Sequence, residues 1–238
     1  MSKPGQKGRV SLDRAISKLG LASRAEAKSL IEEGRVKVHG SIEKNSSRLV
    51  NPDTAHIEID GHKAIKNRTR LILFHKPKGA LTTKRDPEGR KTIYDLLPVE
   101  FQSLHPVGRL DLHTSGLLLL TNDTRLSSHL TDPENQIERT YLVGVEGEVL
   151  DSTLSQLTAG VLDEGELLRA DQVKVLKRSG KESLLELILT EGKNREVRRL
   201  CMALGHEVRT LRRIRFGEYE LGDLKPGEWR EATSDERD

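Results

Sequence analysis

Arg109 and Asp111 lie two residues apart in a polar stretch with a glycine on each side, Gly108 and Gly116. A carboxylate on such a loop can attack a substrate as a nucleophile or remove a proton from it. The same Arg-x-Asp spacing is typical of a solvated ion pair, or of an aspartate that caps a turn. The residue types alone therefore leave two interpretations of Asp111, one catalytic and one structural.

An apolar run, Leu117 to Leu120, follows this polar stretch and ends at Thr121. Its length and its flanks favour a fully buried strand over a helix. We therefore expect Asp111 to lie on a loop held against a core strand. That is a common position for a catalytic carboxylate.

The composition predicts a folded protein rather than a disordered one. Of the 238 residues, 34% are hydrophobic and 32% are charged, and the formal net charge is +3. This length suits one large domain, or a modest domain beside a small one. The single cysteine, Cys201, excludes an internal disulfide and a cysteine-rich metal site, and its apolar neighbours predict a buried thiol.

No part of the sequence predicts a membrane segment or a secretion signal. Residues 1–8 lack the apolar core of a signal peptide and predict a flexible leader. No apolar run approaches the length of a membrane-spanning helix. We therefore expect a cytoplasmic protein with no membrane partner.

The beginning of the chain predicts a very small domain. Apolar residues at helical spacing predict a helix over 12–19, and Ser23 with Glu26 forms a capping box that opens a second helix. His39-Gly40 predicts the turn of a hairpin. Two helices and a hairpin make a small core, so we expect a binding module over residues 9–60 rather than an enzyme.

Basic residues gather on the polar side of this module. Such side chains are usually only solvated. Residues 12–38, however, resemble the RNA-binding domain of ribosomal protein S4, which implies that the second helix lies against RNA. The cations would then contact phosphates, which supply affinity and register rather than sequence choice. The candidate RNA-binding residues are Arg14, Lys18, Arg24, Lys28, Arg35 and Lys37.

The rest of the chain, over residues 69–233, predicts a larger domain after a boundary near 61–68. Strands are predicted over 71–74, 138–145 and 184–189, and helices over 126–130 and 197–204. Residues 151–182 predict a helix near Leu154 followed by loops, and residues 233–238 predict a frayed tail. Tyr141 lies near the start of a strand, where a tyrosine usually packs in the core.

Positive charge is concentrated between Thr190 and Arg215. Three acidic residues oppose eight basic ones there, a local excess of five positive charges that exceeds the excess of the whole chain. Such a patch is typical of nucleic-acid binding, and its one-sided balance argues against a merely solvated helix face. The basic residues are Lys193, Arg195, Arg198, Arg199, Arg209, Arg212, Arg213 and Arg215.

Three motifs together resemble the RsuA/RluB family of ribosomal RNA pseudouridine synthases. They are Gly108-Arg109-Leu110-Asp111, the strand around Tyr141, and the run from Glu191 to Arg199. The resemblance implies that Asp111 is the catalytic residue and that Tyr141 packs on the target uracil. It also implies that a basic residue of the third motif pairs with Asp111. We assign this role to Lys193, with Arg195 as the alternative.

The same resemblance implies further contacts with the substrate. Arg109 would fill the space that a flipped nucleotide leaves, or hold its phosphate, and Leu200 would line the uracil pocket. Lys76 begins a Lys-Pro-x-Gly turn that the family carries after the first strand of its catalytic domain. The other candidate substrate-binding residues are Arg195, Arg198 and Arg199.

The reaction of this family breaks the glycosidic bond of uridine, turns the uracil, and joins it to the ribose through carbon 5. Nothing is oxidised and no group is imported, so the resemblance implies neither a cofactor nor a metal. The target base has to be flipped out of its stack. The implied fold is α+β: a two-helix and hairpin RNA-binding domain, then a pseudouridine synthase domain with a mixed or antiparallel sheet flanked by helices.

The resemblance is closer to the branch that modifies large-subunit ribosomal RNA. The loop Asp86-Pro87-Glu88-Gly89-Arg90 and the third motif favour this branch, and small-subunit RNA is the alternative substrate. A non-catalytic RNA-binding or ribosome-assembly factor is a further alternative, but it would be expected to lack Asp111 or Tyr141. We expect a monomer that binds ribosomal RNA, either free or within a precursor particle.

Overall fold

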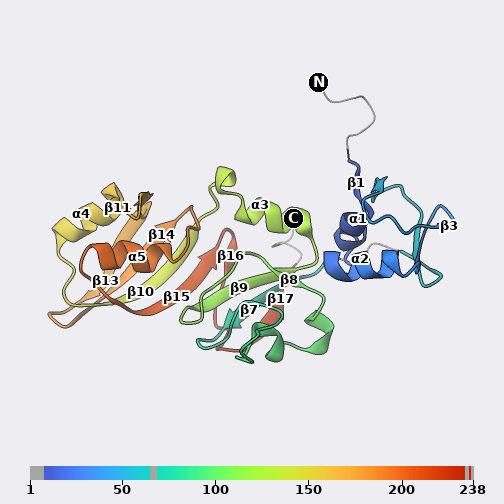
Figure 1. Ribbon diagram of the computed structural model, residues 1–238. Coiled ribbons are helices and arrows are strands. Elements are labelled where there is room, and N and C mark those ends of the chain that lie inside the picture. The colour runs from blue at the N-terminus through green and yellow to red at the C-terminus, as the bar shows by residue number, and fades with distance from the viewer. Residues whose placement is uncertain (1–7, 65–68, 234–235, 237–238) are drawn as a thin grey trace, which may run out of the picture. The chain divides into compact units, whose positions relative to one another are not determined.

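The computed structural model describes residues 8–64, 69–233 and 236, which Figure 1 draws in colour. The leader expected over residues 1–8 lies almost wholly outside this described part, as do portions of the boundary and of the tail expected at 61–68 and 233–238. No helix within the described ranges is both long and apolar enough to cross a membrane.

The described residues form two compact units, each with its own hydrophobic core. The first unit contains the chain up to Arg70 together with Val99–His105 and Thr121–Thr124, and the second contains the remainder. The domain limits expected from the sequence, 9–60 and 69–233, stay a prediction.

Two short helices and small sheets make up most of the first unit. The helices are α1 (Leu12–Lys18) and α2 (Arg24–Glu32). The strands are β1 (Val10–Ser11), β2 (Val36–Val38), β3 (Ser41–Ile42), β4 (Leu49–Val50), β5 (Ile57–Ile59) and β6 (His62–Lys63). β3, β2, β5 and β6 form one antiparallel sheet in that order, and β1 pairs with β4. The predicted helices and hairpin are confirmed.

Local chemistry explains how this unit is built. Ser23 Oγ accepts a hydrogen bond from the Glu26 N–H, while the Glu26 carboxylate accepts one from the Ser23 N–H. The predicted capping box is therefore present at the start of α2. Leu12, Ile16 and Ile31 are fully buried at the centre of the core, where the two helices meet.

A mixed sheet runs through the second unit. Its main strands are β7 (Leu71–Lys76), β9 (Ser115–Thr121), β10 (Arg139–Glu146), β13 (Gln172–Arg178), β14 (Glu182–Leu189), β15 (Val208–Phe216) and β17 (Trp229–Glu231). Their order is β13-β14-β10-β15-β9-β7-β17, with β8 (His105–Pro106) beside β9 and β16 (Tyr219–Glu220) beside β15. β15 and β9 are parallel, whereas β10 is antiparallel to both β14 and β15. The predicted α+β class with a mixed sheet is confirmed.

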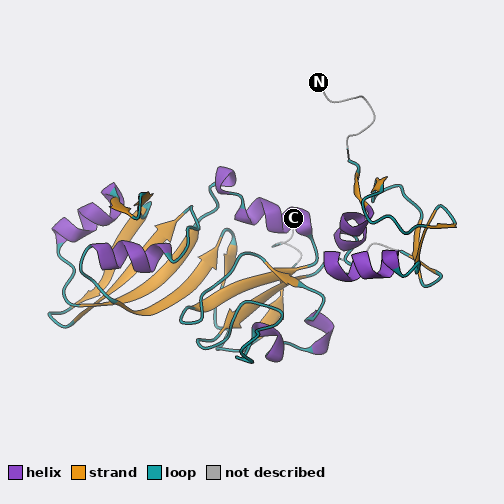
Figure 2. Cartoon of the chain, in the orientation of Figure 1, coloured by secondary structure: helices purple, strands orange, loops and turns teal. Residues whose placement is uncertain are grey.

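Three helices accompany this sheet: α3 (Thr124–Thr131), α4 (Asp151–Ala159) and α5 (Glu196–Ala203). Short 3-10 turns lie at Ile93–Asp95, Val99–Phe101 and Pro133–Asn135. Figure 2 shows α4 and α5 beside the sheet, and Leu157 of α4 and Leu200 of α5 share one core with Leu187 of β14. Cys201 lies in this core too, and burial raises the pKa of its thiol to about 12.

Two segments of the second unit test the secondary structure predicted from the sequence. The apolar run Leu117 to Leu120 is a strand whose four side chains are fully buried, as predicted. Residues expected to be loops after α4 instead form a hairpin, β11 (Val161–Asp163) and β12 (Glu166–Leu168), and then the edge strand β13. The turn of the hairpin is possible because Glu164 and Gly165 both take positive φ angles, +49° and +81°.

Candidate active site

A buried lysine holds the loop that carries Asp111. Lys76, the last residue of β7, is fully buried. Its ammonium donates hydrogen bonds to the carbonyl oxygens of Asp111 (3.0 Å), Thr114 (2.8 Å) and Pro77 (3.1 Å), so all three of its donors are used. Burial lowers the pKa of Lys76 to about 8, and the nearby Asp111 carboxylate opposes this effect only in part.

Other residues also contact the main chain of this loop. Thr82 Oγ1 donates to the Leu110 carbonyl (2.8 Å) and accepts from the Leu110 N–H (3.3 Å). From α5, Arg198 Nη2 donates to the His113 carbonyl at 3.0 Å. The loop is thus positioned through its backbone, which leaves the Asp111 carboxylate available to other partners.

The Asp111 carboxylate faces Arg195, the residue before α5. Its Oδ2 lies 3.5 Å from Arg195 Nη1, and the two side chains are 38% and 48% exposed. An ion pair this long and this exposed is weak, so it orients the carboxylate without closing it to a ligand. Arg195 has a φ of +49°, an uncommon conformation for a residue other than glycine, and such residues cluster at functional sites.

A cavity of about 320 Å³ opens beside this pair. Its volume is at the lower end of the range found for small-molecule pockets. The wall combines the Asp111 loop, the turn before α5, and the strands β10 and β15. Side chains that matter to its chemistry are Arg109, Asp111, Tyr141, Arg195, Arg213 and Phe216.

Tyr141 and Arg213 are direct cross-strand neighbours in the wall of the cavity. The register of β10 and β15 pairs them, and residues paired in this way point to the same face of a sheet. A hydrogen bond joins the two side chains. Tyr141 is half-buried and packs against the core beneath α5, so the strand sets the plane of its ring.

Gly116 allows the Asp111 loop to reach this wall. In the parallel pairing of β9 with β15, Gly116 lies opposite Arg213. A Cβ atom at Gly116 would lie 2.1 Å from the carbonyl oxygen of Arg213, and its φ is +106°. Only glycine fits there, because the backbones of the two strands touch at this point.

Comparison with known proteins identifies both units. The model of the RNA pseudouridylate synthase family matches residues 70–203, and that of the S4 domain matches residues 10–55. The chain is 40% identical over 228 residues to an uncharacterized RNA pseudouridine synthase of Aquifex aeolicus (strain VF5), which covers 95% of this chain and 92% of that protein. The chain belongs to the RNA pseudouridine synthase family.

Two further comparisons agree with this family assignment. The chain is 39% identical over 227 residues to ribosomal large subunit pseudouridine synthase B of Vibrio cholerae, and the match covers 92% of this chain and 70% of the relative. A crystal structure of a pseudouridylate synthase aligns with 95% of this chain and 97% of its own, with a TM-score of 0.67 and 29% identity. The resemblance drawn from the three sequence motifs is therefore confirmed, as is the S4-type resemblance at the N-terminus.

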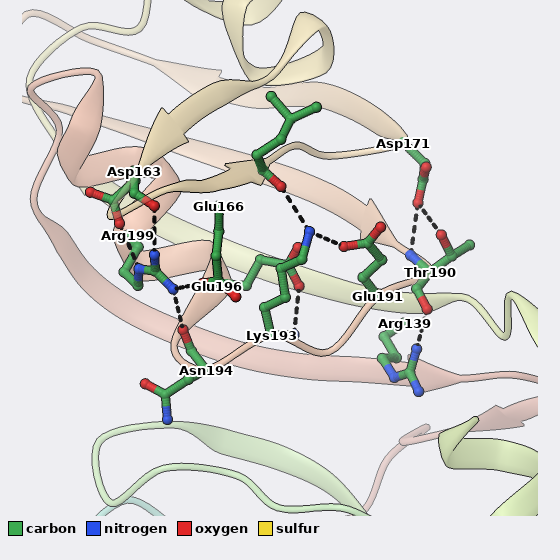
Figure 3. A network of polar contacts seen from close by, with 11 residues as sticks. Arg139, Asp163, Glu166, Asp171, Thr190, Glu191, Lys193, Asn194, Glu196 and Arg199 are labelled. Carbon is green, nitrogen blue, oxygen red and sulfur yellow. Dashed lines mark hydrogen bonds and ion pairs between the residues drawn. The ribbon is translucent and has the colours of Figure 1, made fainter. Parts of the chain in front are cut away.

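Lys193, which was predicted to pair with Asp111, has other partners in this synthase. Its ammonium donates to the Leu167 carbonyl at 2.8 Å and pairs with the Glu191 carboxylate (Figure 3). The predicted Lys193–Asp111 pair is therefore wrong, and the alternative, Arg195, occupies that position. The contacts of the two residues show that their side chains leave the loop in different directions.

Leu200 does not line the cavity, contrary to the prediction. It is fully buried in the core between α5 and the sheet. Val197, one turn earlier on the same side of α5, reaches the cavity instead, together with Leu189 and Leu211. The apolar face of α5 was predicted correctly, but helical spacing alone does not show which turn of a helix meets a pocket.

Three other predicted substrate-binding residues, Lys76, Arg198 and Arg199, make hydrogen bonds within the scaffold. The Lys76 ammonium donates all its hydrogen bonds to carbonyl oxygens, and Arg198 donates to the carbonyl oxygens of His113 and Val208. Arg199 bonds to the carboxylates of Asp163 and Glu166, each at 2.6 Å, and so ties the β11–β12 hairpin to α5 (Figure 3). None of the three side chains lines the cavity, and their binding of the substrate stays a prediction.

Several cations of the predicted basic patch over residues 190–215 have acidic partners. Arg209 pairs with Glu146 at 2.6 Å and with Glu207 at 3.1 Å, and Arg199 is held by acids of the hairpin. Arg213 is buried. Glu207 belongs to the segment itself, whereas Glu146, Asp163 and Glu166 lie on other strands, so a local charge count does not include them.

The candidate RNA-binding cations of the first unit divide into two groups. Arg24 pairs with Asp13, Lys28 with Glu32, and Arg35 with both Asp60 and Glu33. The remaining cations form no ion pair with any other described residue, which leaves their charges available to phosphates. They are Arg14, Lys18 and Lys37.

The sequence analysis also missed residues that shape the cavity, chiefly Arg213, Arg139 and Glu196. Arg213 was counted only as surface charge. The sequence held a signal for the burial of Arg213, because Arg213 lies two positions after the apolar Leu211 and so shares its face of the strand. In the described part of the chain no group of three or more His, Cys, Asp or Glu side chains is placed to hold a metal ion.

Proposed function

We propose that this synthase converts a uridine of large-subunit ribosomal RNA to pseudouridine, with Asp111 as the catalytic carboxylate. The observation that carries the proposal is the accessible Asp111 carboxylate in the wall of the cavity, facing Arg195 at 3.5 Å. The choice of large-subunit RNA is supported by the name of the Vibrio cholerae relative.

The geometry suits a flipped uridine. A base that enters the cavity would meet the ring of Tyr141, while its ribose would lie near Asp111. Asp111 then attacks the ribose or removes a proton from it, and Arg195 orients the carboxylate in either case. The freed uracil turns against Tyr141 and bonds to the ribose through carbon 5.

The exposed side chain of Arg109 also lines the cavity. From this position it would hold the phosphate of the flipped nucleotide, or take the place of the base in the RNA stack. Arg14, Lys18 and Lys37 of the S4-type unit would add sequence-independent phosphate contacts. The enzyme would act as a monomer in the cytoplasm, on ribosomal RNA that is free or within a precursor particle.

Tritium release tests this proposal. Large- and small-subunit ribosomal RNAs carrying tritium at carbon 5 of uracil, free or in subunits, are incubated with the intact protein and with Asp111→Asn. We expect release from large-subunit RNA by the intact protein alone, with RNA binding retained by the variant. Release only from small-subunit RNA would show that small-subunit RNA is the substrate. Binding without release from any RNA would favour the non-catalytic assembly factor.

A further inference from the structure

Arg213 carries a buried charge for which the protein supplies no counterion. The residue is 3% exposed, and no carboxylate among the described residues pairs with it. Its Nε donates to the Leu117 carbonyl at 2.8 Å, while Nη2 is buried and has no hydrogen-bond partner in the described structure. Burial lowers the pKa of Arg213, which shows that the fold disfavours this cation.

Such an arrangement is destabilising unless something else completes it. A buried donor without an acceptor loses its hydration without compensation, and a buried cation without a partner loses still more. Unpaired groups of this kind are rare in folded proteins, and those that persist are often found at functional sites. Because Arg213 lies in the wall of the cavity, a ligand there can supply the missing acceptor.

Arg139 provides an internal comparison. Both guanidinium groups pack on the ring of Phe216, at 4.8 Å for Arg139 and 4.6 Å for Arg213. Arg139, however, donates to the carbonyl oxygens of Ile137, Thr190 and Leu130. Its donors are used by the protein, so it acts as a structural residue. Arg213 retains an unused donor beside the same ring.

The position of Arg213 indicates which part of a nucleotide it meets. It is the cross-strand neighbour of Tyr141, against which the base would pack, and it is nearly inaccessible to solvent. The exposed cations Arg109 and Arg195 stand at more accessible positions around the same cavity, where a phosphate can keep part of its hydration. A neutral base with carbonyl oxygens fits the buried position better than a phosphate does.

We propose that the Arg213 guanidinium donates a hydrogen bond to a carbonyl oxygen of the flipped uracil and stabilises the negative charge that this ring gains during the reaction. The inference rests on the proposed function. When the bond from N1 to the ribose breaks, its electron pair passes to the uracil ring and spreads to the oxygens on carbons 2 and 4. The charge is returned when carbon 5 bonds to the ribose, loses its proton, and N1 takes one up.

A buried cation next to the ring acts where that charge develops, and this is a strong form of catalytic stabilisation. Removal of one such donor typically lowers kcat by about 100-fold or more. We therefore expect Arg213→Met to lower the single-turnover rate at saturating RNA about 100-fold, with the Kd for RNA changed less than about threefold. Arg213→Lys keeps the positive charge but loses the planar guanidinium, so its rate should lie between those of the wild type and Arg213→Met.

Sulfur substitution in the RNA separates this role from a structural one. Sulfur accepts hydrogen bonds weakly, so 2-thiouridine or 4-thiouridine at the target position removes the acceptor at one oxygen. We expect one of the two to slow the wild-type protein about tenfold and to leave the already slow Arg213→Met almost unchanged, because both changes remove the same interaction. Only the first part of this measurement, the slowing of the wild-type protein by one of the two thio-substituted RNAs, needs no variant.

Several outcomes would overturn the inference. Equal slowing of wild type and variant by both thio-substituted RNAs would show that Arg213 does not contact a uracil oxygen. A raised Kd with an unchanged saturating rate would make Arg213 a phosphate ligand. Wild-type protein that forms no pseudouridine would overturn the proposed function and this inference with it, whereas an active wild type and an equally active Arg213→Met would overturn the inference alone.

Discussion

Arg195 Nη1 lies 3.5 Å from Asp111 Oδ2, although 84 positions separate the two residues in the sequence. The pair brings the turn before α5 to the loop before β9, and the cavity opens beside it. Lys193, only two positions earlier, bonds instead to Leu167 and Glu191. The third motif therefore contributes two cations with different tasks, one at the carboxylate and one at the hairpin.

This division predicts unequal effects of two substitutions. Arg195→Ala removes the cation that orients Asp111, so we expect kcat to fall about 100-fold. Lys193→Met breaks a partly exposed ion pair, and the rate should stay within about threefold of wild type. Single-turnover pseudouridine formation measures both. The reverse order of effects would restore Lys193 as the partner of Asp111.

The buried ammonium of Lys76 predicts a pH dependence of stability. Its pKa falls from 10.5 to about 8 on folding, so between these values the unfolded chain binds a proton that the native protein lacks. The unfolding free energy contributed by this group therefore rises with pH across that window, by at most about 3 kcal/mol. Denaturant unfolding of wild type and Lys76→Met from about pH 7 to 10 measures it as a difference. Parallel curves would contradict the assignment.

Activity should respond to the same titration in the opposite sense. A neutral Lys76 amine has two donors for three carbonyl oxygens, so the Asp111 loop loses one contact. We expect kcat to fall as pH rises above about 8. Lys76→Met should lower kcat at every pH, and should remove the component of the decline that Lys76 causes. An identical profile in the variant would show that another group titrates.

Gly116 predicts a large and specific loss of stability. In Gly116→Ala the new methyl group would collide with the Arg213 carbonyl, so β9 and β15 must separate. We expect a loss of about 3 kcal/mol or more in unfolding free energy. Gly165→Ala is the matched control: its φ is also positive, +81°, but nothing lies within 4 Å of the added atom. Conformational strain alone should cost about 1 kcal/mol there. Thermal or denaturant unfolding compares the two.

The S4-type unit predicts which cations bind phosphate. Arg14 and Lys18 form no ion pair with a described residue, whereas Arg35 bonds to Asp60 and Glu33. Replacing Arg14 and Lys18 with alanine should weaken RNA binding and reduce the slope of log K against log salt by about 1 for each cation. Arg35→Ala should leave the slope nearly unchanged. Wild-type slopes for the Arg14→Ala and Lys18→Ala variants would mean that Arg14 and Lys18 do not meet RNA.

Elements encoded by neighbouring residues could be predicted from the sequence. Ser23 and Glu26 are three positions apart and form their capping box within one turn, and the run Leu117 to Leu120 is buried as its composition indicates. The edge strand β13 alternates Gln172 and Lys174 with Val173 and Val175, a pattern typical of a strand, although loops were predicted there. The position of Asp111 on a loop before a buried strand could be predicted because its motif is contiguous.

The remaining errors concern side chains whose partners lie far away in the sequence. Arg195 and Lys193 share a loop, and only the left-handed backbone at Arg195 and the position of β12 separate their tasks. In the sequence Arg199 resembles a substrate ligand, because its acidic partners in the β11–β12 hairpin are more than 30 positions away. Arg213 shares a strand face with Leu211, a weak signal in the sequence, and its burial in the structure makes it distinctive.

The contacts of Lys76, Thr82 and Arg198 with the Asp111 loop all end on backbone atoms. The shape of the loop is thus specified by residues that do not depend on the identity of the side chain at position 111. An inactive Asp111→Asn protein should therefore keep the geometry of the working enzyme and hold its RNA without turning it over. It is a suitable bait for capturing the natural RNA target from a cell and for viewing the nucleotide in place.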